Sequence, residues 1–368
     1  MFNNIVLKNN TARKGFPVYL LGTLISTLCV SLSLAYEIDS DANIHDSTAS
    51  LLGINHIGLS VQDLDATLDF YLTATNFKLV KREVVANNND ADRLFGRKGV
   101  AYERAVLEAP NMLFELTEFS HNRETPMRVM PVYGPGMTHT CFQSPAHLSG
   151  YDKFKQAGAR MLSRGDEPVD LLGQGVTYAY AYDPEGNMLE LEQLDFSVLG
   201  GDPRKPEWVD AGLDMWMTQV ALVTHDIERL TTYYSEILGF NPYRAADISN
   251  RLPFDDATDI DDVSLKVVFF RMAQRTKSME FWQYVNPETP QIQGDRDSTA
   301  LGYSYSIEVG DIQAEYARMT DLGVKFVSEP VLIGDFWQVY ANDIDGNVFA
   351  LRQAVDPNSP WSLPNLEL

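Results

Sequence analysis

INHIGLSVQDLDATLDFYLTATNFKLV, residues 54–80, has a counterpart in MTQVALVTHDIERLTTYYSEILGFNPY, residues 217–243. Both stretches begin with alternating apolar residues, pass through an aspartate, continue with apolar residues three or four positions apart, and end in another apolar run. Alternation with a period of two predicts a strand, and spacing of three to four predicts an amphipathic helix. Asp63 and Asp226 stand where a helix N-cap is expected. The two stretches therefore predict a repeated strand, helix and strand.

A second repeat consists of YAYDPEGNMLELEQ at residues 180–193 and YANDIDGNVFALRQ at residues 340–353. Each predicts two strands joined by a tight turn that contains aspartate, glycine and asparagine. Two shorter expected strands, THTCFQ at residues 138–143 and SYSIEV at residues 304–309, each precede a further expected helix. We therefore predict four β-α-β-β-β modules and an α+β fold class.

The modules are divided between two expected domains. A chain of 368 residues is long enough for two domains with separate cores. The region around residues 196–212 is rich in glycine and proline and lacks periodicity, so we predict a linker there. A first domain at residues 51–195 and a second at residues 213–353 flank this linker, and residues 354–368 are expected to form a tail.

The charge balance excludes one class of partner. The chain has 51 acidic and 29 basic side chains, a net charge of −22, which repels phosphate backbones and anionic lipid surfaces. Nucleic acid is therefore not an expected partner. The composition, 45% apolar and 22% charged, is that of a folded globular protein and excludes a disordered or fibrous chain. The oligomeric state stays open.

Residues 1–35 predict an export signal. Basic residues at positions 8–14 form a positive leader, residues 16–35 carry no charge, and the stretch ends in Ser-Leu-Ala, which suits signal peptidase. We expect a periplasmic or secreted protein that is free of the membrane once the signal is removed; an uncleaved anchor is the alternative. Removal leaves Cys141 as the only cysteine, so no internal disulfide is expected.

Three polar residues interrupt strands whose other residues are mostly apolar. His56, Glu115 and Glu190 are each followed by an apolar residue that would face a helix. Strand alternation places the three polar side chains on the opposite face. An ionised glutamate in a core strand is costly to bury alone, so a cation or a hydrogen-bond partner is expected beside it.

The repeated module, with the strands INHIGLSV, MLFELTEF, THTCFQ and DPEGNMLELEQ, resembles the vicinal oxygen chelate superfamily. That superfamily includes glyoxalase I, bleomycin-resistance proteins and extradiol dioxygenases, and the resemblance implies two domains of the glyoxalase/bleomycin-resistance type. Position by position, it implies that one divalent metal ion in the first domain is held by His56, Glu115, His139 and Glu190. Two imidazoles and two carboxylates suit Zn, Ni, Mn or Fe(II).

The second half provides an internal comparison. Its equivalent positions are Gln219, Glu280, Ser304 and Ala350. Only one of these is a strong ligand, so a degenerate metal site is expected in the second domain. In the family, two modules pair around one site. The expected site of four ligands therefore requires the first module to pair with the second. Pairing of the first module with the fourth would separate the four expected ligands.

The resemblance implies chelation of two neighbouring oxygens of a small substrate. Glyoxalase I-like isomerase or lyase chemistry would then pass through an enediolate that the metal stabilises. Glu190 is the expected base that moves the proton, with Glu115 as a second base or permanent ligand. Glyoxalase I acts on a glutathione adduct in the cytosol, whereas this chain carries an expected export signal. Lactoylglutathione is therefore not the expected substrate.

Two other functions stay open. His56, His139 and Glu190 form a two-histidine, one-carboxylate set that fits the Fe(II) of an extradiol-type ring-cleavage dioxygenase, although Glu115 would occupy a position that dioxygen or catechol needs. A non-catalytic small-molecule-binding protein of the bleomycin-resistance type would use the same fold without a metal. Such proteins lack the ligand set that this chain has.

Overall fold

The computed structural model describes residues 35–37, 49–126, 129–170, 173–199, 209–272, 278–292 and 294–366. All of these belong to one compact unit, Leu34–Leu368. The expected export signal, apart from Ala35, and residues 200–208 of the expected linker lie outside the described residues. No helix within the described ranges is long and apolar enough to cross a membrane.

Four segments of the chain each begin with a strand, continue into a helix and end in strands. The first segment contains β2 (Leu51–Val61), α1 (Leu64–Ala74), β3 (Lys78–Val85), α2 (Asn89–Leu94), β4 (Tyr102–Glu108) and β5 (Leu113–Phe119). The second contains β6 (Gly136–His139), β7 (Cys141–Pro145), α3 (Gly150–Ala157), β8 (Arg160–Met161), β9 (Val169–Asp170), β10 (Val176–Tyr182) and β11 (Met188–Leu194), and α4 (Phe196–Leu199) follows it.

The other two segments follow the same order. The third contains β12 (Trp216–Met217), β13 (Gln219–Val223), α6 (Ile227–Leu238), β14 (Arg244–Ile248), α7 (Leu252–Thr258), β15 (Ser264–Arg271) and β16 (Ser278–Asn286). The fourth contains β17 (Gly302–Val309), α8 (Ile312–Asp321), β18 (Lys325–Phe326), β19 (Val331–Ile333), β20 (Phe336–Asn342) and β21 (Val348–Ala354). This mixture of sheets and helices confirms the predicted α+β class.

The two expected helix caps are present. The carboxylate of Asp63 accepts a hydrogen bond from the backbone N–H of Ala66 at 3.0 Å, and that of Asp226 accepts one from Arg229 at 3.0 Å. Each satisfies a donor that the first turn of a helix leaves free. The buried faces of α1 and α6 then pack into the main apolar core.

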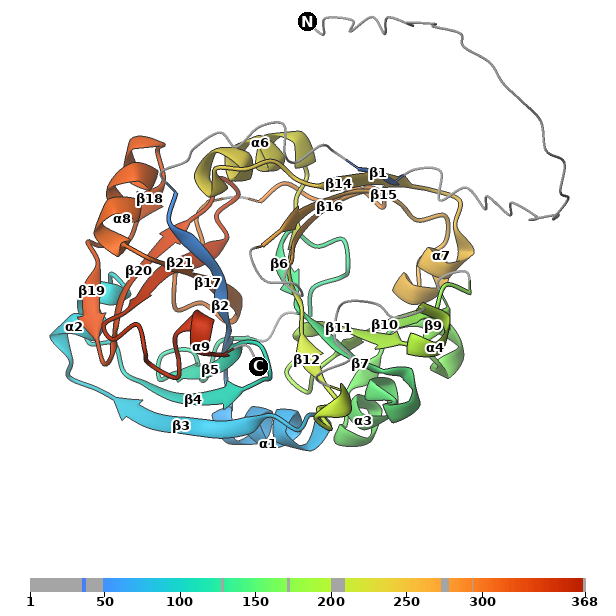
Figure 1. The fold of residues 1–368 in the computed structure, drawn as a ribbon, viewed down its shortest axis with the longest axis horizontal. Coiled ribbons are helices and arrows are strands. Elements are labelled where there is room, and N and C mark those ends of the chain that lie inside the picture. Colours follow the sequence, from blue (N-terminus) through green and yellow to red (C-terminus); the bar gives the residue numbers. More distant parts are fainter. Residues whose placement is uncertain are drawn as a thin grey trace, which may run out of the picture. The chain divides into compact units, whose positions relative to one another are not determined.

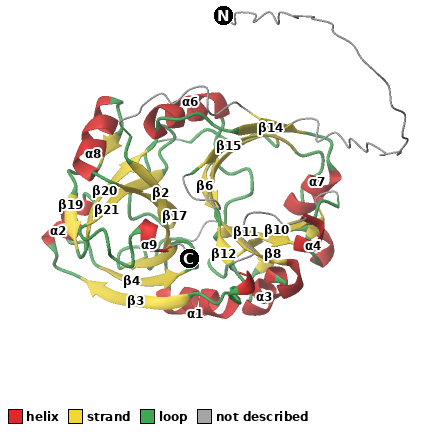
Figure 2. Cartoon of the chain, in the orientation of Figure 1, coloured by secondary structure: helices red, strands yellow, loops and turns green. Residues whose placement is uncertain are grey.

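The strands form three sheets (Figure 1 and Figure 2). A nine-stranded sheet has the order β18-β20-β21-β17-β2-β5-β4-β3, with β19 beside β20. One six-stranded sheet has the order β1-β14-β15-β16-β13-β6, in which β1 is Ala35–Glu37. The other has the order β12-β7-β11-β10-β8, with β9 beside β10.

The segments pair across the two halves of the chain. In the nine-stranded sheet, β2 of the first segment lies antiparallel to β17 of the fourth. The second and third segments pair through β6 with β13 and through β7 with β12. In Figure 1 the sheet of the first and fourth segments accordingly lies on the left of the view and most strands of the second and third lie on the right, with the helices α1 and α6 near the middle.

Contacts from helices to turns hold each half together. The hydroxyl of Tyr71 on α1 donates to Asp183 in the turn before β11 at 3.3 Å, and Tyr234 on α6 donates to Asp343 in the equivalent turn at 2.9 Å. Each aspartate also accepts three hydrogen bonds from its own turn. The sheets thus join the halves, while the tyrosine–aspartate contacts join neighbouring segments.

The C-terminal region differs from the expected tail. The short helix α9 (Leu363–Leu366) buries Leu363 and Leu366. The carboxylate of Glu308 on β17 accepts hydrogen bonds from the Leu363 backbone at 2.7 Å and from Asn55 at 2.6 Å. Burial of two leucines and these bonds explain why this stretch packs on the sheet, although its sequence has no periodic pattern.

Candidate functional site

In each segment the last strand lies parallel to the strand that directly precedes the first helix, in the same register. Glu115 faces Gly58 across the sheet, Glu190 faces Cys141, Glu280 faces Ala221 and Ala350 faces Ser306. The facing residue lies two positions after His56, His139, Gln219 and Ser304, respectively. Equivalent positions inferred from the sequence are therefore equivalent in the structure.

The structure does not bring the four expected metal ligands together. His56 and Glu115 lie on β2 and β5 of the nine-stranded sheet, beside the fourth segment. His139 and Glu190 lie on β6 and β11, beside the third segment. This corrects the expected site of four ligands in the first domain: pairing of the first segment with the fourth separates the two pairs.

A first cluster, here the middle site, consists of His139, Glu190, Gln219 and Glu280. Gln219 Nε2 donates to Glu190 Oε1 at 3.1 Å, and His139 Nε2 lies 3.3 Å from Glu190 Oε2. All four side chains are buried. The third segment, expected to be degenerate, thus supplies half of a buried cluster with two carboxylates, an imidazole and an amide.

A break in the paired strands positions this cluster. β6 ends at His139 and β7 begins at Cys141, while β12 ends at Met217 and β13 begins at Gln219. The hydroxyl of Thr140, at the break, donates to the backbone carbonyl of Gln219 at 2.8 Å. His139 and Gln219 therefore meet where the strand pair passes from one sheet to the other.

The polar groups of the middle site are only partly satisfied. Thr138 Oγ1 lies 2.9 Å from His139 Nδ1, but His139 Nε2 has no hydrogen-bond partner among the described residues. Burial raises the pKa of Glu280, and the charges of Glu190 and Glu192 raise it further. A buried imidazole nitrogen without a partner beside crowded carboxylates is the environment that a bound cation would relieve.

Further possible ligands lie beside this cluster. Atoms of Cys141, Glu190 and Glu192 lie within 4.8 Å of one another. Burial raises the pKa of the Cys141 thiol, and the neighbouring glutamates add to the effect. Alternation along β11 predicts that Glu192 shares a strand face with Glu190, although Glu192 was not among the ligands expected from the sequence.

Aromatic side chains surround the middle site. Tyr178, Tyr180, Trp282 and Tyr284 belong to one buried cluster, and the ring of Tyr180 lies 5.3 Å from that of His139. The Tyr178 hydroxyl and the Trp282 indole N–H have no hydrogen-bond partner among the described residues. The site thus combines an apolar wall with free polar groups, which is typical of small-molecule sites.

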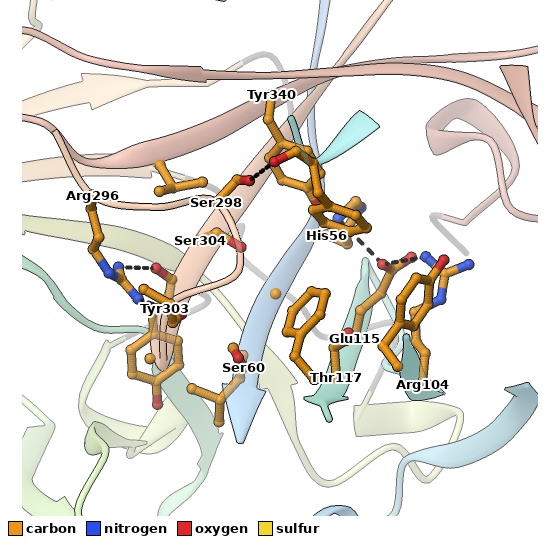
Figure 3. Close-up of a pocket in the computed structure, with 18 residues that line it drawn as sticks. His56, Ser60, Arg104, Glu115, Thr117, Arg296, Ser298, Tyr303, Ser304 and Tyr340 are labelled. Atoms are coloured by element: carbon orange, nitrogen blue, oxygen red, sulfur yellow. Dashed lines mark hydrogen bonds and ion pairs between the residues drawn. The ribbon is translucent and has the colours of Figure 1, made fainter. Parts of the chain in front are cut away.

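The second cluster, here the terminal site, consists of His56 and Glu115 with Arg104 and Arg352. Figure 3 shows His56, Arg104 and Glu115 of this cluster. Arg352 Nη1 lies 2.9 Å from Glu115 Oε1 and 3.0 Å from His56 Nδ1, and Arg104 Nη1 lies 3.2 Å from Glu115 Oε2. Ser304 and Ala350 stand at the remaining equivalent positions. A guanidinium therefore contacts both of the expected ligands.

The charges of the terminal site do not suit a metal. Burial lowers the pKa of His56 to about 3, so the ring is neutral. Burial acts to raise the pKa of Glu115, but the positive charges of Arg104 and Arg352 outweigh it and hold the pKa below its usual value. The ionised Glu115 is already matched by two guanidiniums, and no other strong ligand is present in the cluster. Metal binding and base catalysis by Glu115 are therefore not supported here.

The comparisons with known proteins agree with the fold. Residues 53–191 match the Glyoxalase/Bleomycin resistance protein/Dioxygenase superfamily, and residues 218–340 match a second family of the same description. The ethylmalonyl-CoA/methylmalonyl-CoA epimerase of Cereibacter sphaeroides is 27% identical over 143 residues, which are 38% of this chain and 97% of that protein.

Two solved structures share the architecture. Glyoxalase I from Zea mays has a TM-score of 0.55 and 21% identity, over 82% of this chain and 92% of that one. A putative dioxygenase from Bacillus subtilis has a TM-score of 0.55 and 12% identity, over 87% of this chain and 89% of that one. With two family matches and this shared fold, the chain belongs to the Glyoxalase/Bleomycin resistance protein/Dioxygenase superfamily, also called the vicinal oxygen chelate superfamily, as a two-domain member.

Proposed function

We propose that the protein is a metal-dependent enzyme whose active site is the middle site. His139, Glu190, Gln219 and Glu280 would hold one divalent ion. The observation that carries this proposal is His139 Nε2, which is buried, has no hydrogen-bond partner among the described residues and lies 3.3 Å from Glu190. An imidazole, an amide and two carboxylates form a mixed donor set for Zn, Ni, Mn or Fe(II).

The proposed reaction moves a proton at a carbon next to a carbonyl group, as an isomerase or lyase would. A divalent ion bound at this site would act as a Lewis acid on the substrate oxygen. Glu190 and Glu280 come from two segments and serve as the proton-moving carboxylates, one taking the proton at a carboxylate oxygen and the other able to return it. Glu115, the second base expected from the sequence, lies in the terminal site and has no part in this step.

The surroundings favour an uncharged substrate with an apolar body. Glu190, Glu192 and Glu280 place three carboxylates at or beside the site, so an anionic group next to them would be repelled. Tyr178, Tyr180 and Trp282 offer apolar and aromatic surface on the same side of the sheet pair. A small aromatic hydroxyketone combines neighbouring oxygens with such a body.

The dioxygenase alternative loses its expected ligand set. His56 does not join His139 and Glu190, because β2 pairs with β17. Any iron would have to use the same middle site that supports the isomerase or lyase proposal. Ring cleavage therefore serves as the competing outcome in the test.

The test follows deuterium exchange at the carbinol carbon of 2-hydroxyacetophenone by proton NMR in D₂O. The full-length protein is loaded separately with Zn, Ni, Mn and Fe(II). The proposal expects exchange that depends on the added metal and is lost in Glu190→Gln. Absence of exchange with all four metals, together with oxygen uptake on catechol under Fe(II), would show the dioxygenase instead.

A further inference from the structure

A pocket opens at the terminal site, away from the proposed metal centre. His56, Arg104 and Glu115 lie at one side of it and Arg296 at the other, with hydroxyl groups between them (Figure 3). The cavity volume of about 30 Å³ is room for about two or three waters at 10–15 Å³ each. A ligand of this pocket is therefore very small.

Arg296 lacks a counter-charge. Its guanidinium donates to the backbone carbonyls of Tyr303 at 2.7 Å and Ala300 at 3.1 Å, and also to Leu301. In the described part of the chain no carboxylate lies within ion-pair distance of it, and burial lowers its pKa to about 10. Arg104 and Arg352, in contrast, both contact Glu115, and Arg104 also contacts Glu83.

Donors remain free around this cation. A guanidinium has five N–H groups, and three hydrogen bonds of Arg296 are accounted for by backbone carbonyls. The Ser304 hydroxyl, where the other segments have a histidine or glutamine, makes no hydrogen bond within the described residues. Gly58 leaves the space beside this hydroxyl open, because a Cβ there would lie 2.6 Å from Ser304 Oγ.

We propose that the terminal site binds a small monocarboxylate anion, with its carboxylate at Arg296 and the Ser304 hydroxyl. A carboxylate supplies the acceptors and the negative charge that Arg296 lacks, and guanidinium groups bind carboxylates in a bidentate way. The size of the cavity limits the acid to about one carbon beyond the carboxylate, as in acetate. The first and fourth segments thus form a metal-free anion site, distinct from the proposed metal centre.

The test measures binding of acetate to the full-length protein by isothermal titration calorimetry, with acetamide as the uncharged control of equal size. We expect one acetate per chain and at least a ten-fold weaker affinity for acetamide. Arg296→Gln should weaken acetate binding at least ten-fold, while Arg164→Gln, which removes a half-buried arginine that pairs with Asp259 and Asp261 elsewhere, should not. Equal binding of acetate and acetamide, or undiminished acetate binding by Arg296→Gln, would overturn the proposal.

A second variant covers the case in which Arg296→Gln does not fold, since Arg296 also holds the backbone before β17. Gly58→Ala keeps every charge and places a methyl group against Ser304 Oγ. It should weaken acetate binding at least ten-fold while the metal content stays that of the wild type. Unchanged acetate affinity in Gly58→Ala would place the anion elsewhere and contradict the proposal.

Discussion

Gln219 donates a hydrogen bond from Nε2 to Glu190 Oε1 over 3.1 Å, although the two residues come from different segments and opposite halves of the chain. This bond exists because the second and third segments pair with each other. It joins β11, the last strand of the second segment, to β13 of the third. The middle site is therefore a product of pairing across the halves.

Glu190→Gln and Glu280→Gln should each lower the rate of substrate deuterium exchange by about 10²–10⁴-fold, the usual contribution of a general acid or base. Glutamine keeps the size and an oxygen donor but cannot accept the proton. NMR exchange rates at saturating metal provide the measurement. Glu167→Gln, a change at an exposed residue, is the control. Rates in Glu190→Gln and Glu280→Gln that are no lower than in this control would refute the assignment.

Arg352→Met should lower the free energy of unfolding by about 3–5 kcal/mol, the cost of breaking a buried ion pair from one side. Glu115 would keep only Arg104 as a charged partner. Urea denaturation measures the loss. The double variant Glu115→Gln with Arg352→Met should lose less free energy of unfolding than Arg352→Met alone, because both charges of the ion pair are then removed. A larger loss in the double variant would contradict the assignment of the ion pair.

Acid should destabilise the protein through His56. Its folded pKa of about 3 lies below the unfolded value of about 6.5, so the unfolded chain binds the extra proton first. Stability is thus lost as the pH falls from about 6.5 toward 3, by about 4 kcal/mol in total. Urea midpoints at pH 7, 6, 5 and 4 check this. His56→Asn should flatten the slope, and an unchanged slope would exclude His56 as its source.

Asp183→Ala and Asp343→Ala should each cost about 2–4 kcal/mol, since each removes the acceptor of several buried hydrogen bonds. Each aspartate binds its own turn and the tyrosine of the helix in the preceding segment. Thermal unfolding compares both with Asp195→Ala, a half-buried aspartate whose carboxylate accepts hydrogen bonds from Ser197. Losses no larger than that of the control would show that the turns do not depend on these carboxylates.

The repeated pattern was enough to predict the fold class and which positions of the four segments are equivalent. Period-two and helical spacing mark β2, α1, β13 and α6, and Asp63 and Asp226 cap both helices as expected. The shared register of Glu115, Glu190 and Glu280 against the first strands shows that a repeat can place single residues. These features depend on local sequence, which is why they could be predicted.

The pairing of the segments could not be predicted in this way. The alternating pattern of β2 is compatible with either β17 or β6 as its neighbour in the sheet. The pattern alone therefore does not select the partner strand. One signal was present but was not used. Arg352 lies two positions after Ala350, on the strand face that meets Glu115. The positive charge of Arg352 complements the negative charge of Glu115 in the first segment, so that no metal ion is needed there. This charge complementarity indicates that the fourth segment pairs with the first.

The most direct test of the central claim is the metal content of the purified wild-type protein and three single variants, measured by elemental analysis after dialysis. The account predicts about one divalent ion per chain in the wild type and in His56→Ala. It predicts loss of the ion in His139→Ala and marked loss in Gln219→Ala, because both residues belong to the middle site. Retention in Gln219→Ala together with loss in His56→Ala would contradict the account and restore a site built from the first two segments.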